Sequence, residues 1–169
     1  AISDYAQIMI KPGKKDKIAV IYAEGTITNY YSGNDGMSGS IIGSKTFTED
    51  LMGIKKDSSV KAVVIRVNSP GGSALASELI FQSIRELENI KPVYVSYGPV
   101  AASGGYYISC GAKRIFTTPS TITGSIGVVS ILMDVSELSK KLGVTFETIK
   151  QHKYDDFLSP FRPATEEEI

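Results

Sequence analysis

The stretch Val60-Lys-Ala-Val-Val-Ile-Arg-Val67, followed by the turn Asn68-Ser-Pro-Gly-Gly-Ser73, decides the fold. The first part is a run of β-branched and other apolar residues, which predicts a buried strand. After the turn, apolar residues recur at helical spacing from Ala74 to Glu88 and predict an amphipathic helix. A strand, a short turn and a helix in succession are typical of an α/β domain with a largely parallel sheet.

The alternation of strands and helices continues on both sides of this unit. Residues 29–45, rich in glycine and asparagine, are predicted to form a flexible loop that could cover a cleft. We expect one domain over residues 17–169, preceded by a linker or junction segment over 1–16. Further strands are predicted at Ile18–Tyr22, Pro92–Ser96, Arg114–Thr117 and Val144–Ile149, and further helices at Thr46–Lys56 and Val135–Leu142, the last one capped by Gly143.

The composition is that of an ordinary globular domain. With 42% hydrophobic residues, no net charge and one cysteine in 169 residues, the chain is neither disordered nor a disulfide scaffold. A net charge of zero provides no long-range attraction for nucleic acid, so no such partner is expected. No cofactor or metal is expected either, and Cys110 is predicted to be a small buried residue with no role in a site.

Two stretches contain residues suited to catalysis. The Gly71-Gly72 pair lies between a strand and a helix, where glycine allows positive φ and lets backbone N–H groups approach a ligand. This arrangement could form an oxyanion hole, although a tight turn without a ligand would have the same sequence. In Val100-Ala-Ala-Ser-Gly-Gly105, Ser103 has the small neighbours that a nucleophile at a helix start requires. Its alternative role is that of a helix cap.

A serine nucleophile needs a base, and the sequence offers several. His152 is the only histidine, and a triad of Ser103, His152 and Asp155 or Asp156 can be drawn. However, a histidine in a polar run is usually a solvated surface residue. A lysine with a lowered pKa is the other option, and Lys150 and Lys153 are the local candidates.

Three motifs together resemble the signal peptide peptidase A (protease IV) family: Val67-Asn-Ser-Pro-Gly-Gly72, Ala101-Ala-Ser-Gly-Gly-Tyr-Tyr-Ile-Ser109 and Thr118-Pro-Ser-Thr-Ile-Thr-Gly-Ser-Ile-Gly127. The resemblance covers about Lys17 to Pro160. It implies a Clp protease/crotonase-like fold of repeated β-β-α units and a Ser-Lys dyad that cleaves remnant signal peptides. It further implies Ser103 as the nucleophile, the N–H groups of Gly71 and Gly72 as the oxyanion hole, and Ser125 as the residue that positions the lysine.

The position of the lysine departs from the family pattern. An ungapped match places Asp155 where the short form of the family has its lysine, and Lys153 reaches that position only with a gap. In the long form, a tandem duplication, the lysine lies in the N-terminal half and the serine in the C-terminal half. We therefore expect this chain to be a C-terminal half whose base lies upstream, with Lys153 as the candidate within the chain.

The resemblance also implies a setting for the protein. It suggests peptide substrates, a homo-oligomer (a tetramer for the long form) and association with the bacterial inner membrane, with the active domain on the periplasmic or extracytoplasmic side. Two other functions share the fold. A crotonase-type acyl-CoA enzyme would place acidic residues in its cleft, and a non-catalytic assembly half would bind partners without turning over substrate.

Overall fold

The computed structural model describes residues 16–34, 36 and 39–168. The chain divides into two compact units, one up to Val128 and one from Val129 onward, and each is described by itself. The single domain predicted over 17–169 therefore stays a prediction. The predicted linker over 1–16 lies, except for Asp16, outside the described residues.

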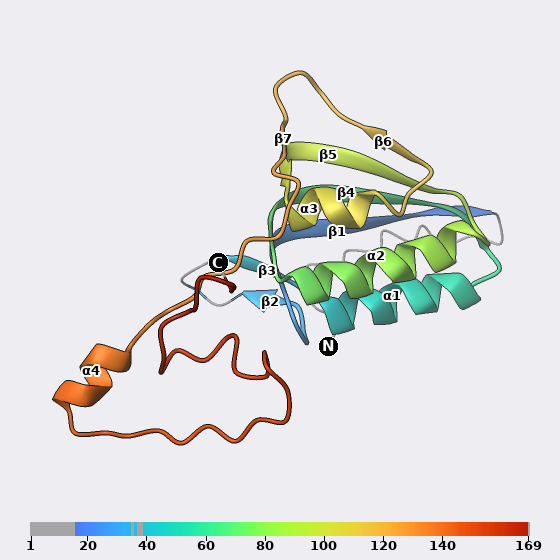
Figure 1. Cartoon of the computed structure of the whole chain (residues 1–169). Helices are drawn as coiled ribbons and strands as arrows, with labels where there is room; N and C mark the ends of the chain where they lie inside the picture. The colour runs from blue at the N-terminus through green and yellow to red at the C-terminus, as the bar shows by residue number, and fades with distance from the viewer. Residues whose placement is uncertain (1–15, 35, 37–38, 169) are drawn as a thin grey trace. The chain divides into compact units, whose positions relative to one another are not determined.

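The first unit is built on one mostly parallel sheet (Figure 1). Strand order is β2-β3-β1-β4-β5-β6, and β7 also pairs with β5. All pairs are parallel except that between β2 and β3, which confirms the predicted α/β class. The elements are β1 (Lys17–Thr28), β2 (Gly33–Asn34), β3 (Ser40–Gly43), α1 (Ser44–Lys56), β4 (Val60–Gly72), α2 (Ala74–Glu88), β5 (Val93–Ala102), α3 (Gly104–Ser109), β6 (Arg114–Phe116) and β7 (Ile122–Gly124).

Helices α1 and α2 lie side by side along the sheet (Figure 1), and the core lies beneath them. Alternate residues of the central strands point into this core, as period-2 strands require. The helices contribute residues at spacings of three and four, as their sequence pattern predicts. The fully buried side chains include Ile21, Val63, Ile65, Val93 and Val95 from the strands and Leu51, Ile80, Ile84 and Leu87 from the helices.

A buried lysine closes the end of α1. Lys91 is 8% exposed, and its ammonium group donates hydrogen bonds to the backbone oxygens of Ile54, at 2.6 Å, and Asp57. The last carbonyls of a helix have no partner within the helix, and a cation there also interacts favourably with the helix dipole. Lys91 thus ties α1 to the start of β5.

Two segments differ from the sequence prediction in this unit. The predicted loop over 29–45 contains β2 and β3, because β1 continues to Thr28 and pairs its last three residues with Ile41–Gly43. Strand β4 continues through the predicted turn as far as Gly72, because Gly71 and Gly72 pair with Thr26 and Ile27 of β1.

The second unit contains one helix among its described residues, α4 (Ser136–Lys141). Gly143 follows it with φ +69°, which confirms the predicted cap. The strand predicted at Val144–Ile149 is wrong: this segment pairs with no strand in the described part of the chain, and its side chains are exposed. A β-branched sequence forms a strand only where a neighbour accepts and donates the ladder hydrogen bonds.

Candidate active site

Ser103 lies between the end of β5 and the start of α3, at the carboxyl edge of the sheet. Its backbone has φ 51° and ψ −118°, a conformation that residues other than glycine rarely adopt. Two hydrogen bonds hold it there: the Ser103 N–H donates to the Gly124 oxygen at 2.9 Å, and the Ser103 oxygen accepts from the Tyr107 N–H at 2.8 Å. Strain held in place by surrounding structure is a feature of functional sites.

The hydroxyl of Ser103 is free to react. The side chain makes no capping hydrogen bond to α3, so the alternative role of helix cap is wrong. Ser103 is partly exposed, and within the described residues its Oγ has no recorded hydrogen-bond partner. The flanking Ala102 and Gly104 leave room for a substrate carbonyl beside it.

The glycines at the end of β4 face Ser103 directly. A β-carbon added to Gly71 would lie 2.8 Å from the Ser103 Cβ and 2.6 Å from the Gly104 nitrogen. A β-carbon on Gly104 would in turn lie 3.2 Å from the Gly72 nitrogen. Gly71 and Gly72 have φ of +102° and +153°, which glycine alone adopts without strain. The structure therefore brings together three of the residues singled out in the sequence.

The two glycine amides point to different partners. The Gly71 N–H donates to the Ser69 hydroxyl at 3.1 Å, inside the protein. Gly72 is paired with Ile27, whose oxygen accepts from the Ser73 N–H at 2.8 Å. Along a strand, the N–H groups of successive residues point alternately toward and away from a given neighbouring strand, and the Ser73 N–H points toward β1. The Gly72 N–H thus faces away from β1, which makes it the better oriented of the two predicted donors.

Gly104 is a candidate donor that the sequence analysis did not include. It is the first residue of α3, where backbone N–H groups have no partner within the helix. In the described part of the chain its N–H has no recorded acceptor. The signal in the sequence was its place directly after the candidate nucleophile.

Ser125 comes close to this arrangement through the neighbouring strand. It follows Gly124, whose oxygen accepts from the Ser103 N–H, and Gly124 is paired with Ala102. Ser125 itself has φ 52° and is exposed. This location suits a residue that positions a base beside Ser103, and that role stays a prediction.

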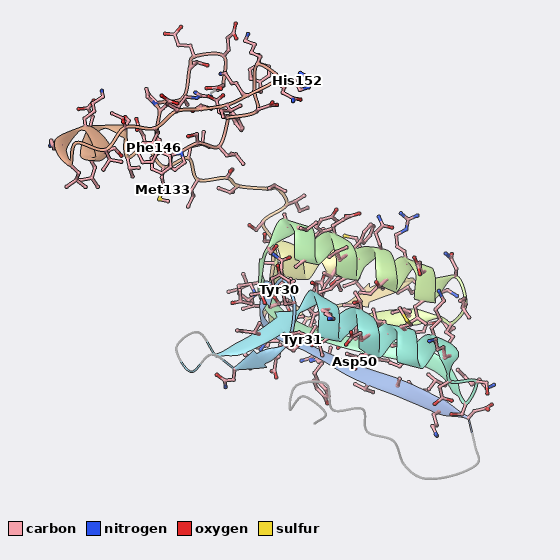
Figure 2. All side chains as sticks on the ribbon, turned by 90° about the horizontal axis from the view of Figure 1, so that it is seen from below. Tyr30, Tyr31, Asp50, Met133, Phe146 and His152 are labelled. Carbon is pink, nitrogen blue, oxygen red and sulfur yellow. The ribbon has the colours of Figure 1, made fainter. Side chains whose placement is uncertain are left out.

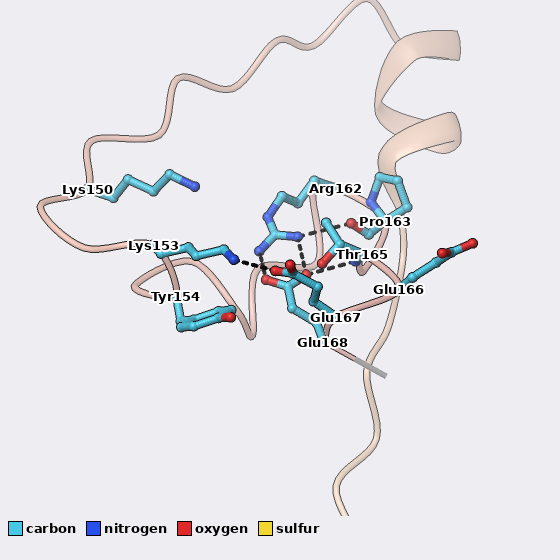
Figure 3. Close-up of a pocket in the computed structure, with 9 residues that line it drawn as sticks. All are labelled: Lys150, Lys153, Tyr154, Arg162, Pro163, Thr165, Glu166, Glu167 and Glu168. Atoms are coloured by element: carbon cyan, nitrogen blue, oxygen red, sulfur yellow. Dashed lines mark hydrogen bonds and ion pairs between the residues drawn. The ribbon is translucent and has the colours of Figure 1, made fainter.

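The candidate lysines belong to the second unit, where a carboxylate pairs with each of them, and Figure 3 shows the partner of Lys153. Lys153 pairs with Glu167, and Lys150 lies 3.1 Å from Asp156. The hydrogen bond that Lys153 donates to Glu167 raises the pKa of Lys153, with a further contribution from Tyr154. A general base needs the opposite, a lowered pKa, so this environment opposes the role of Lys153 as base.

The second unit does not assemble the acidic part of a triad. Figure 2 shows His152 at the periphery of this unit, and its side chain is exposed. One Asp155 oxygen accepts the backbone N–H groups of His152 and Gln151, at 2.9 and 3.0 Å, rather than the imidazole. Asp156 is bound to Arg162 and Lys150. Neither aspartate orients the histidine ring.

Three other side chains bear on the alternatives. Cys110 is exposed, not buried as predicted, because it follows the last turn of α3, where its thiol donates to the Tyr106 oxygen at 3.4 Å. Glu86 lies 3.2 Å from Lys55, and Glu78 accepts from the Tyr107 hydroxyl. Glu78 and Glu86, acids of α2 that a crotonase-type enzyme could use, are thus paired with other side chains.

Comparison with known proteins agrees with this geometry. Residues 85–169 match the model of peptidase family S49. Over 157 residues, 92% of this chain, it is 40% identical to the chloroplastic serine protease SPPA of Arabidopsis thaliana, covering 23% of that protein. It is 47% identical to protease 4 of Haemophilus influenzae over 76% of this chain and 20% of the relative. The chain thus spans about a fifth of the length of these relatives.

The fold extends beyond peptidases. A solved structure from Magnetospirillum magneticum AMB-1, described as an enoyl-CoA hydratase/carnithine racemase, matches 70% of this chain and 48% of its own, with a TM-score of 0.51 and 13% identity. This likeness confirms the predicted crotonase-like fold and concerns the fold alone. Among the described residues, every helix is too short or too polar to cross a bilayer.

Proposed function

Because this chain belongs to peptidase family S49, we propose that it contributes the nucleophile Ser103 to a serine endopeptidase that cleaves remnant signal peptides and other apolar peptides. The observation that carries the proposal is the strained Ser103, with a free hydroxyl, packed against the Gly71-Gly72 turn. Acyl transfer requires this pairing of a nucleophile with backbone donors.

The reaction begins with removal of the Ser103 proton by a neutral lysine. The hydroxyl oxygen attacks the substrate carbonyl, and the resulting oxyanion accepts hydrogen bonds from the Gly71-Gly72 turn. Gly72 and Gly104 are the better placed donors, since the Gly71 N–H already donates to Ser69. The protonated lysine gives the proton to the leaving nitrogen, the C–N bond breaks to form an acyl-enzyme ester, and water hydrolyses that ester.

The lysine base comes from a segment upstream of this chain. Lys153, the candidate within the chain, is protonated and paired with Glu167, whose hydrogen bond raises its pKa. Ser125, which follows the Gly124 that accepts from the Ser103 N–H, positions the side chain of this lysine.

The protein acts as a membrane-associated homo-oligomer, a tetramer, on the periplasmic or extracytoplasmic side of the bacterial inner membrane. Peptide substrates agree with the names of its relatives, which include a serine protease and a protease 4. The apolar side chains of Leu75 and Ile126, 63% and 78% exposed, follow the Gly72 and Ser125 segments and suit an apolar peptide.

A serine-reactive acylating probe tests this function. The chain, alone and together with its upstream half, is incubated with the probe, and the adduct is located by peptide mass spectrometry, with Ser103→Ala as control. Labelling at Ser103 only when the upstream half is present is the expected result. Labelling of the chain alone that Lys153→Ala abolishes would overturn the upstream base, and absence of labelling in both would overturn Ser103 as nucleophile.

A further inference from the structure

We infer that Ser69 is a positioning residue that holds the oxyanion turn in its active conformation through its side-chain hydroxyl. The inference rests on the proposed function and adds a residue to its machinery. Ser69 does not touch the reacting atoms. It acts on Gly71, and through Gly71 on the orientation of the Gly72 amide.

The register of β4 places Ser69 where the strand bends. Asn68 pairs with Glu24 of β1, but the next pair on this side is Gly71 with Thr26, so Ser69 and Pro70 face only Gly25. On the other side the register also shifts between Val67 and Ser69. Two such irregularities at one place mark a bulge, a feature that re-aims residues next to active sites.

The Ser69 hydroxyl is the group that closes this bulge. Its side chain is fully buried, at 0% exposed, and its oxygen accepts from the Gly71 N–H at 3.1 Å. Gly71 is buried as well, and the Ser69 hydroxyl is the acceptor that its N–H finds within its own strand. A buried N–H without a partner costs about 1–3 kcal/mol. The bulge would therefore relax toward a conformation that satisfies Gly71.

Apart from the pairing of Gly71 and Gly72 with β1, the surfaces that meet at this turn are mostly backbone. A β-carbon on Gly105 would lie 2.7 Å from the backbone oxygen of Ser69, and one on Gly71 would lie 3.0 Å from the backbone oxygen of Ala102. Pro70 has no N–H to donate and is exposed. Side-chain packing cannot lock a contact made of glycines, so the hydrogen bond from Gly71 to the Ser69 hydroxyl acts together with the pairing of these glycines to β1.

The test uses the full-length protein that contains this chain, with Ser69→Ala, Ser69→Thr and a matched control, Ser44→Ala. Ser44 is another buried serine, 4% exposed, at the start of α1. For Ser69→Ala we expect kcat for an apolar peptide to fall about tenfold, less than the 10²–10³ lost with a donor itself, with KM unchanged. Hydrogen exchange of the Gly71 amide should accelerate selectively. Ser69→Thr, which keeps the hydroxyl, should restore most of kcat, and Ser44→Ala should match the wild type.

Three results would overturn the inference: an unchanged kcat in Ser69→Ala, exchange that accelerates throughout the sheet rather than at Gly71, or a folded Ser69→Thr with the same loss as alanine. Should Ser69→Thr not fold, hydrogen exchange of the Gly71 amide in Ser69→Ala still tests the inference. The proposed function fails separately, because it requires Ser103→Ala to be inactive whatever Ser69 does.

Discussion

The Cβ of Ser103 lies 2.8 Å from the point where a β-carbon on Gly71 would stand. Real β-carbons do not approach so closely, so Ser103 occupies its place only because residue 71 lacks a side chain. Ser103 and the turn that faces it are thus a matched pair, and each constrains what the other can be.

Substitution of Gly71 by alanine should therefore disable the site. The added carbon meets the Gly104 nitrogen and Ser103 Cβ, and its φ of +102° strains any other residue. We expect the rate of Ser103 acylation to fall on the order of 10²-fold, comparable to losing an oxyanion donor. Gly53→Ala is the control: nothing lies within 4 Å of its β-carbon in α1, and it should stabilise the chain by about 0.5–1 kcal/mol without affecting acylation. Normal acylation of a folded Gly71→Ala would contradict the geometry.

The positive φ of Ser103 predicts that glycine at this position is more stabilising than alanine, which is the reverse of their order in a helix. At φ 51° glycine is unstrained, so Ser103→Gly should unfold at a higher urea concentration than Ser103→Ala, by about 1 kcal/mol in free energy. In the middle of α2 the order reverses, and Ser83→Gly should be less stable than Ser83→Ala by about 1 kcal/mol. The same order at both positions would show that Ser103 is not strained.

Removal of the buried ammonium at Lys91 should destabilise the first unit. Lys91→Met leaves the backbone oxygens of Ile54 and Asp57 without their donor, which costs about 1–3 kcal/mol in the free energy of unfolding. Lys56→Met, at an exposed position in the last turn of α1, should change the free energy of unfolding by less than about 0.5 kcal/mol. Urea denaturation of the two variants provides the measurement, and equal stabilities would refute a capping role.

Acid should loosen the second unit at the Arg162 cluster. Hydrogen bonds from Arg162 and from the Thr165 backbone lower the pKa of Glu168 from 4.5 to about 2. Because the pKa is lower in the folded state, this contribution is complete above 4.5 and disappears as the pH falls through about 2. Phe161, next to Arg162 in the sequence, stacks on Phe146 with ring centroids 3.7 Å apart. The NMR signals of these two rings should therefore shift as Glu168 becomes protonated.

Glu168→Gln supplies the control for that titration. Glutamine cannot ionise, so the ring signals of this variant should be shifted toward the acid form at neutral pH and should change less than those of the wild type as the pH is lowered toward 2, the remaining change coming from Asp156. A wild type whose ring signals are constant over the same range would count against the ion pair as the support of this segment.

Local patterns predicted the elements that build the core. The helix over Ala74–Glu88 has the predicted bounds, because its apolar spacing and the Ser73 cap at its start are local features. Strand ends were less predictable: the polar end of β1, Gly25 to Thr28, is a strand because β3 and β4 flank it. Val144–Ile149 shows the converse, since a strand-like sequence without a pairing neighbour remains irregular.

The candidate site likewise has local features that the sequence predicts and nonlocal features that it does not. Ser103 and the glycine pair were recognisable because nucleophiles and oxyanion turns need small residues. The Ser69–Gly71 hydrogen bond and the direction of the Gly72 amide were not, since both depend on a bulge created by two neighbouring strands. The backbone angle of Ser103 depends likewise on β7, which lies later in the chain.

The nonlocal origin of the site has a consequence for the newly synthesised chain. Gly72 and Ser103 are separated by all of α2 and β5 and meet only when β4 and β5 pair in parallel, a slow, long-range step of folding. Until that step is complete, Ser103 is an ordinary serine, which is a weak nucleophile. Under the proposed function, acylation of Ser103 therefore requires the finished sheet, and a chain in which β4 and β5 are unpaired has no assembled site.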